Sequence, residues 1–154
     1  MIYRTLQILT MAVSGLMVGN ELAVAVFLHP TLRNFSKEVQ VPLRTAFAAL
    51  FGKVMPFWYI ATALLTIALT WMGPPLVSTG GRLLLASTIL WLVTIVFTVI
   101  FPAPLNSRIA KWQLKSLPLD WQARERRWDR YHAGRMFMLV AALVCLFAGS
   151  LMAS

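Results

Sequence analysis

The residues best suited to chemistry gather in one stretch of this chain, from Trp121 to Arg135, directly before a long apolar run. The stretch contains three aromatic residues, one histidine and five arginines within fifteen positions. On a helix, Trp128, His132 and Arg135 stand at i, i+4 and i+7 and share one face. A neighbouring stripe of the same helix carries Arg124, Arg127 and Tyr131. Such a face combines aromatic surfaces, fixed positive charge and a titratable imidazole, and it is suited to hold an anionic or aromatic molecule.

The composition predicts that these residues stand in a membrane protein. Of the 154 residues, 59% are hydrophobic and 12% are charged, and this charged fraction is about half that of soluble domains. Four apolar runs are long enough to cross a bilayer, and we expect helices over residues of about 5–29, 44–72, 82–101 and 128–153. The predicted fold is a single all-α domain over residues 1–154, a bundle of four transmembrane helices.

The connection between the third and fourth helices is long enough to have structure of its own. Tryptophans and leucines are interspersed there with lysines and arginines, at Trp112, Leu114, Leu117 and Trp121. This pattern is typical of a helix that lies on the membrane interface. We therefore expect a long cytoplasmic helical connection, interrupted near Pro118.

The basic residues predict an orientation for the bundle. The chain has 14 lysines and arginines against 5 acids, a net charge of +9. All but two of the basic residues flank or fill the connections after the first and third apolar runs, and only Arg4 and Arg82 lie on the opposite side. The positive-inside rule places both connections in the cytoplasm and both termini outside, and we expect a bacterial inner (plasma) membrane. Because topology explains the positive charge, we expect membrane lipid and no nucleic acid as a partner.

Several polar residues lie within or at the ends of apolar helices, where each costs free energy. A charged side chain near the centre of a membrane helix costs about 3 kcal/mol, so Glu21 should face the bundle and be paired or protonated. Its neighbour Asn20 lies at the same depth, and His29 ends the same helix. Asn106 follows the third helix, and His132 opens the fourth. We therefore predict a site in the cytoplasmic half, between helices one, three and four.

These polar residues also have structural explanations. Glu21 could form a buried ion pair with Arg135 or Arg127 that fixes the register of the helices. His29 could end a helix at the interface before Pro30. Both explanations stand beside the functional one.

A metal site is another interpretation of the same residues. Glu21, His29 and His132 together form a two-histidine, one-carboxylate set of the kind that binds metals. Glu21 and His29 are eight positions apart, about 12 Å on a straight helix, so we expect no metal ligands and no cofactor. A haem or metal ion held by His29 and His132 in a redox protein remains an alternative. The lone Cys145 is expected to be a small buried hydrophobe.

The order of these motifs resembles the anthrone oxygenase family of small four-helix membrane proteins. The first helix carries an internal polar pair and ends in His29-Pro30, and Asn106 follows Pro104-Leu after the third helix. The fourth helix opens with Trp128, His132 and Arg135. The resemblance covers nearly the whole chain. It implies an enzyme that oxidises an anthrone to an anthraquinone, with a small lipophilic aromatic substrate and O₂ as its partners.

The resemblance also implies roles for single residues. A phenolic anthrone is flat and apolar and has an acidic C–H, and loss of that proton gives a carbanion that can pass an electron to O₂ without a cofactor. His132 would be the base, and Arg135 or Arg127 would stabilise the oxyanion. Glu21 would orient the imidazole or act as the base itself, and Trp128 would stack on the substrate. The other predicted substrate contacts are Arg127, Asn106, His29 and Asn20.

Two further functions do not need this chemistry. A carrier for an anionic lipophile would need polar groups through both halves of the bundle, and the outer half offers only hydroxyls such as Thr10, Thr62 and Thr88. An accessory subunit or a homo-oligomer would pack small residues such as Gly15 and Gly149 against a partner. The one-sided distribution of polar residues favours a site over a channel.

Overall fold

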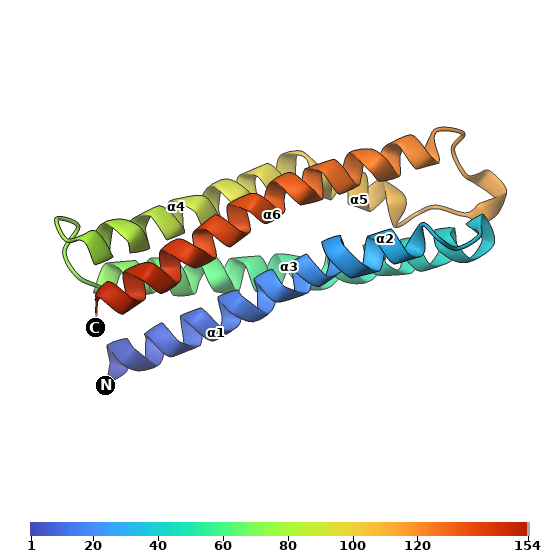
Figure 1. Cartoon of the computed structure of the whole chain (residues 1–154). Helices are drawn as coiled ribbons and strands as arrows, with labels where there is room; N and C mark the ends of the chain where they lie inside the picture. The colour runs from blue at the N-terminus through green and yellow to red at the C-terminus, as the bar shows by residue number, and fades with distance from the viewer. Residues whose placement is uncertain (154) are drawn as a thin grey trace.

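Four long antiparallel helical segments make up the bundle, and short connections join them at its two ends (Figure 1). The computed structural model describes residues 1–153. Each of the four segments is long and apolar enough to cross a membrane: Ile2–Leu32, Lys37–Met72, Thr79–Ile100 and Trp121–Met152. The chain is therefore an integral membrane protein with the all-α four-helix architecture predicted from the sequence.

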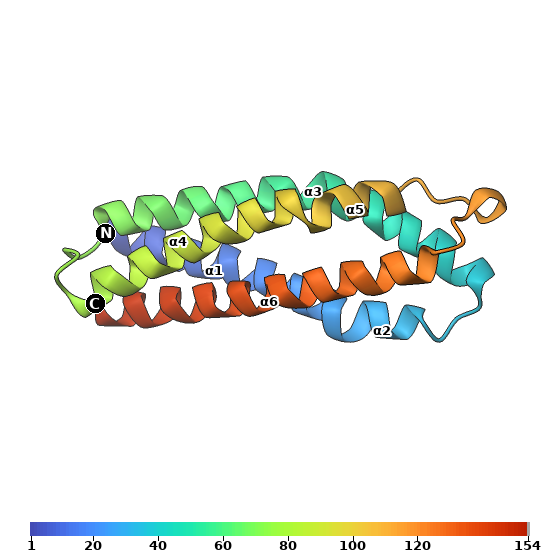
Figure 2. The same cartoon turned by 90° about the horizontal axis from the view of Figure 1, so that it is seen from above.

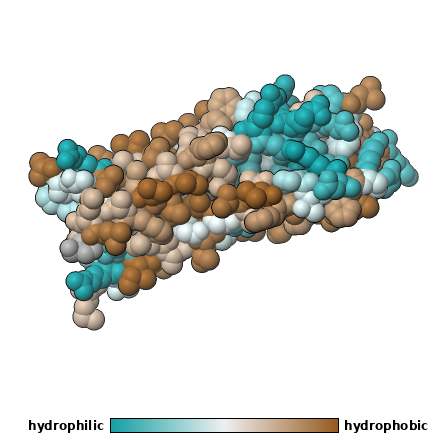
Figure 3. Space-filling model, in the orientation of Figure 1, coloured by the Kyte–Doolittle hydropathy of each residue, from teal (hydrophilic) through white to brown (hydrophobic). Residues whose placement is uncertain are grey.

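The two ends of the bundle differ in character. Both termini lie at one end, which we name the terminal end, together with the connection 73–78 (Figure 2). The connections 33–36 and 110–120 lie at the other end, which we name the basic end. Hydrophilic residues gather over the basic end, whereas most of the visible surface nearer the terminal end is hydrophobic (Figure 3).

The first segment continues beyond His29-Pro30, where the sequence predicted its end. It consists of α1 (Ile2–Ala23), one π-helical stretch η1 (Val24–Leu28) and α2 (His29–Leu32). Pro30 has no backbone N–H, and its ring clashes with the carbonyl four residues earlier in a regular α-helix. A π-helical turn stands directly before this proline, where the His29 N–H donates to the Val24 carbonyl five residues back, and the helix continues through Pro30 as α2. The helix thus widens before the proline and does not end there.

The second and fourth long helices both begin earlier than their apolar runs predict. Helix α3 (Lys37–Met72) begins seven residues before the expected start, and α6 (Trp121–Met152) does the same. The added turns bury polar side chains, Gln40 on α3 and Glu125 on α6. Hydropathy does not register such a buried polar face, so the two helices extend farther toward the basic end than expected.

The long connection before α6 is only partly helical. After α4 (Thr79–Ile100), Pro102 opens the short helix α5 (Pro102–Ile109), and a single 3₁₀ turn η2 (Leu114–Ser116) follows. Proline is favoured at the first turn of a helix, where its missing N–H costs nothing. Trp112 is buried and its ring meets that of Trp121 edge-on at 6.3 Å. The tryptophans of this connection thus close the core of the basic end, and no interfacial helix forms over residues 110–120.

The terminal half of the bundle is tightly packed. Leu69, Leu84 and Leu146 are almost completely buried and form a core cluster there. Helices α4 and α6 approach closely at Gly80 and Gly149, since a Cβ built at Gly149 would lie 3.1 Å from the Gly80 carbonyl oxygen. Gly149 therefore packs within the bundle and is not free to pack against a partner.

We expect Gly149→Ala to destabilise the protein, because the added methyl group would lie 3.0 Å from Leu84 backbone and side-chain atoms. Overpacking of this kind costs about 1–3 kcal/mol, which a fall in the thermal midpoint in mild detergent would report. Gly15→Ala is the matched control, since a Cβ there meets nothing within 4 Å. If the two variants unfold at the same temperature, the close approach of α4 and α6 is wrong.

Candidate active site

A cavity of about 270 Å³ lies in the half of the bundle nearer the basic end. This volume is close to the lower limit of typical small-molecule pockets, about 300 Å³. Apolar and aromatic side chains make up most of its wall, contributed by all four helical segments and by α5. Seven of the eight side chains predicted to form the site line it: Asn20, Glu21, His29, Asn106, Trp128, His132 and Arg135.

Glu21 stands at the end of the cavity that is farther from the basic end. Its side chain is buried and ion-paired, with Arg135 Nη2 donating to Oε2 at 2.7 Å. The hydroxyl of Tyr59 donates to the other carboxylate oxygen at 3.2 Å. The Arg135 guanidinium also lies over the Tyr59 ring, 5.7 Å from its centroid. The carboxylate, which would be costly alone at this depth, is thus held by two donors from two other helices.

His132 connects this ion pair to the backbone of the first segment. Its Nε2 lies 3.1 Å from the Glu21 carbonyl oxygen, which can only accept, so Nε2 carries the proton. In the neutral imidazole, Nδ1 then accepts from Arg135 Nη2 at 2.7 Å. Nδ1 also lies 3.3 Å from Glu21 Oε2. Both ring nitrogens therefore have protein partners, and the imidazole fixes Glu21 and Arg135 relative to each other.

The π-helical stretch η1 brings His29 to the same cavity as Glu21. Eight residues of a regular α-helix would place them about 80° apart around the axis. The i→i+5 pattern turns the chain less per residue, so it rotates His29 back toward the face that carries Glu21. Both side chains line the cavity as a result. Single π turns are frequent at functional sites.

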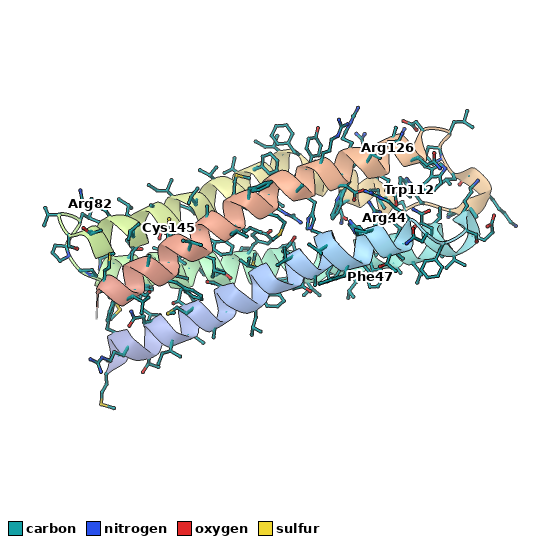
Figure 4. All side chains as sticks on the ribbon, in the orientation of Figure 1. Arg44, Phe47, Arg82, Trp112, Arg126 and Cys145 are labelled. Carbon is teal, nitrogen blue, oxygen red and sulfur yellow. The ribbon has the colours of Figure 1, made fainter. Side chains whose placement is uncertain are left out.

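A second polar cluster lies nearer the basic end and centres on Asp129. One of its carboxylate oxygens meets His29 Nδ1 at 3.0 Å and Arg44 Nη2 at 2.9 Å, and the other pairs with Arg33. Arg44 Nε also reaches Glu125 Oε1 at 3.1 Å. Figure 4 shows Arg44 between the helices, whereas Arg126 projects from the outside of α6. Arg44 thus forms buried ion pairs, and it is also one of the basic residues that the positive-inside rule counts.

The ring of Trp128 joins the two clusters. It stacks on His132 at 4.7 Å and 15° between the planes, and it meets His29 edge-on at 4.5 Å. The Arg44 guanidinium lies 5.4 Å from its centroid. These contacts cover much of the Trp128 ring and hold it in place. The rest of the side chain lines the cavity.

The two asparagines have smaller roles. Asn106 Nδ2 donates to the Ala48 carbonyl oxygen at 2.8 Å, which ties α5 to α3. Asn20 Nδ2 lies 3.7 Å from the sulfur of Met55. Both line the cavity. Among residues 1–153, neither forms a hydrogen bond to Glu21, Tyr59, His132 or Arg135.

Arg127 does not take part in the site. Its side chain is exposed and it is absent from the cavity wall. One residue along a helix turns the side chain by about 100°, so Arg127 points outward when Trp128 points inward. Arg127 therefore makes no ion pair with Glu21 and does not line the cavity in this structure.

Several residues of the two polar clusters around Glu21 and Asp129 were not predicted from the sequence. These are Gln40, Arg44, Tyr59, Glu125 and Asp129. A signal existed for two of them: the chain has 5 acids in all, and Glu125 and Asp129 stand about one turn before Trp128 and His132, respectively, on α6. Arg44 and Tyr59 lie in an ordinary amphipathic pattern, and only the packing of α3 against α6 identifies them.

The charges of the two clusters balance. Three arginines, Arg33, Arg44 and Arg135, pair with three carboxylates, Glu21, Glu125 and Asp129. Counted as ions, they sum to zero. A neutral ligand would therefore leave the balance intact, whereas a permanent anion would add an unpaired charge.

Within residues 1–153, no group of three His, Cys, Asp or Glu side chains is arranged to hold a metal ion. The rings of His29 and His132 are 5.9 Å apart. A haem or metal shared by them would need His132 to give up its bond to Arg135 or to the Glu21 carbonyl.

Residues 44–145 match the family described as anthrone oxygenase, which is about two thirds of the chain. The chain belongs to the anthrone oxygenase family. The match includes Arg44, Tyr59 and the inward row from Glu125 to Arg135, and it leaves out Asn20, Glu21 and His29. Comparisons with curated proteins and with solved structures found no match.

We expect Arg135→Gln to lower the free energy of unfolding by about 3–5 kcal/mol, because it leaves the buried Glu21 carboxylate without its ion-pair partner. The double variant Glu21→Gln with Arg135→Gln should recover much of this loss, since no uncompensated charge remains. Thermal unfolding in detergent measures both, with Arg126→Gln on the exposed face of α6 as the control. A double variant no more stable than Arg135→Gln alone would contradict the pairing.

Proposed function

We propose that this protein is a membrane oxygenase that converts a small, flat phenolic substrate of anthrone type into the corresponding quinone. A base removes a proton from the CH₂ group, and the resulting carbanion passes an electron to O₂ and combines with it to give a peroxide. After protonation, the peroxide loses water while the second hydrogen leaves the same carbon. The carbon loses four electrons and O₂ gains them, so one oxygen atom enters the new C=O and the other leaves as water.

The observation that carries this proposal is the buried Glu21 carboxylate on the wall of an apolar cavity. An ionised carboxylate has about four lone-pair positions, and the donors from Tyr59 and Arg135 occupy two of them. The others can receive the substrate proton. Tyr59 and Arg135 hold the carboxylate in one orientation, which is what a general base requires.

His132 then has a positioning role. Its Nε2–H is bonded to the Glu21 carbonyl, and its Nδ1 lone pair accepts from Arg135. To take the substrate proton, His132 Nδ1 would have to give up the hydrogen bond from Arg135. The imidazole would then carry a positive charge next to the Arg135 guanidinium, which is unfavourable. We therefore assign proton removal to Glu21, and we assign to His132 the alignment of the Glu21–Arg135 pair.

Arg135 is suited to stabilise the negative charge that develops on the substrate oxygen. Its side chain is buried and lines the cavity, and its Nε has no hydrogen-bond partner among residues 1–153. A fixed donor in a water-poor site stabilises an oxyanion more strongly than water would. Loss of the C–H proton moves charge onto the carbonyl oxygen, which this N–H can receive.

The surroundings of the cavity suit an apolar substrate. Phe51, Met55, Ile95 and Val99 are among the side chains of its wall. Anthrones and O₂ both partition into lipid, so a site within the bilayer meets them at raised concentration. The packed Leu69, Leu84 and Leu146 cluster fills the terminal half, so the cavity has no path toward the terminal end. This supports a reaction site and disfavours a carrier with a path through the membrane.

We expect Glu21→Gln to lower kcat for anthrone oxidation at least 100-fold, in line with the typical contribution of a general base. The amide keeps the size of the side chain but cannot take the proton. Oxygen uptake by the purified protein in detergent, with anthrone as substrate, measures the rate. Arg127→Gln is the control and should leave it unchanged, because that side chain is exposed.

The Glu21→Gln variant must be folded for this test, which its elution volume in size-exclusion chromatography and its thermal midpoint show. Turnover by folded Glu21→Gln at the native rate would exclude Glu21 as the base. With ¹⁸O₂, one labelled atom should enter the quinone; a quinone without label would exclude the oxygenase reaction.

We also propose that the basic end faces the cytoplasm and both termini face outside, because only Arg4 and Arg82 among the basic residues lie at the terminal end. The test uses Val77→Cys at the terminal end and Lys115→Cys at the basic end, both in a Cys145→Ala background. A membrane-impermeant maleimide should label Val77→Cys in intact bacterial cells and Lys115→Cys only after the membrane is opened. The reverse pattern would invert the orientation.

A further inference from the structure

Two buried donors near the basic end of the cavity have no hydrogen-bond partner among residues 1–153. They are Nη1 of Arg44 and Nε1 of Trp128, and both residues line the cavity and are more than nine-tenths buried. Buried polar groups nearly always have a partner, and an exception calls for an explanation. Neither donor belongs to the Glu21 cluster, so the reaction assigned to that cluster does not use them.

The Arg44 guanidinium is fixed on its other edges. Its Nε reaches Glu125 at 3.1 Å and its Nη2 reaches Asp129 at 2.9 Å. Gln40 Nε2 lies 3.0 Å from both oxygens of Glu125 and holds that carboxylate in turn. The guanidinium plane is therefore set by α6, and Nη1 remains as its one edge without an acceptor among the described residues.

The Trp128 indole is fixed in the same way. It stacks on His132, meets His29 edge-on and lies under Arg44. A ring held on several sides cannot turn its N–H toward a new partner, so an acceptor has to come to it. The two free donors thus belong to neighbouring, immobile groups on one cavity wall.

We propose that Arg44 and Trp128 form a subsite for a neutral oxygen acceptor, a phenolic hydroxyl or a carbonyl, at the end of the substrate remote from the reacting carbon. This inference rests on the proposed function, because it concerns the substrate of the same cavity. A carboxylate does not fit as well, since Glu125 and Asp129 already balance Arg44 and Arg33. An added negative charge would lie close to both carboxylates.

The spacing along α6 indicates the length of such a substrate. Trp128 and Arg135 are seven residues apart, which corresponds to about 10 Å along the helix axis. One molecule that contacts both must therefore be elongated, about as long as three fused six-membered rings. The expected substrate class is a tricyclic phenol with an oxygen at the end of its long axis.

The experiment measures dissociation constants without O₂, so that no turnover occurs, with the full-length protein in detergent. Three probes are compared: anthrone, an anthrone with a hydroxyl at the end of its long axis, and the matching carboxylate. The wild type should bind the hydroxylated probe about five- to tenfold more tightly than anthrone, the gain of one or two hydrogen bonds. The carboxylate should bind no more tightly than anthrone.

Trp128→Phe should remove most of this gain, because it deletes Nε1 and keeps an aromatic ring. Arg44→Lys, which cannot present Nη1 in a fixed plane, should do the same. The matched control is Trp112→Phe, a buried tryptophan outside the cavity wall that should keep the full gain. The ratio of the two dissociation constants is used because any loss of ring packing affects both probes.

Three results would overturn the subsite. They are an unchanged ratio in both Trp128→Phe and Arg44→Lys, a wild-type ratio close to one, or tighter binding of the carboxylate. If any of these occurs while anthrone still supports O₂ uptake, the proposed function stands and only the subsite fails. If no anthrone binds and no O₂ is consumed, the proposed function and the subsite fail together.

Discussion

The ion pair between Glu21 and Arg135 is the interaction on which the rest of the site depends. An unpaired carboxylate in an apolar helix is costly, so the pair requires the first helical segment and α6 to meet in one register. Tyr59 and His132 bind the same pair from α3 and α6. The helices are therefore arranged so that the Glu21 carboxylate on the cavity wall always has its partners.

Two prolines near the basic end shape the backbone around this cavity without breaking the bundle. Pro30 follows the π-helical stretch that rotates His29 onto the face of Glu21, and Pro102 opens α5, which carries Asn106 to the Ala48 carbonyl. Both residues lie where a sequence alone would place a helix end. Here each redirects a helix and adds a polar side chain to the cavity wall.

Charge balance and incomplete hydrogen bonding together describe the ligand that the site would accept. Three arginines and three carboxylates sum to zero, so the cavity has no net charge to offer an anion. Donors on Arg44, Trp128 and Arg135 still lack acceptors among residues 1–153. A neutral, flat molecule with one oxygen acceptor for Arg135 and another for Arg44 and Trp128 satisfies the donors and leaves the charges paired. Membership of the anthrone oxygenase family is consistent with such a ligand.

The sequence by itself determined the membrane class, the four helices and seven of the residues that line the cavity, because apolar length and isolated polar groups are local properties that can be read one residue at a time. Glu21, His132 and Arg135 were recognisable since a polar side chain in an apolar run needs a reason. Only the tertiary structure decided the partners. Arg44 and Asp129 look like ordinary surface charges in the sequence, and Arg127 looks like a site residue. Their burial depends on how α3 and α6 face each other, which is a property of packing between helices and not of either helix alone.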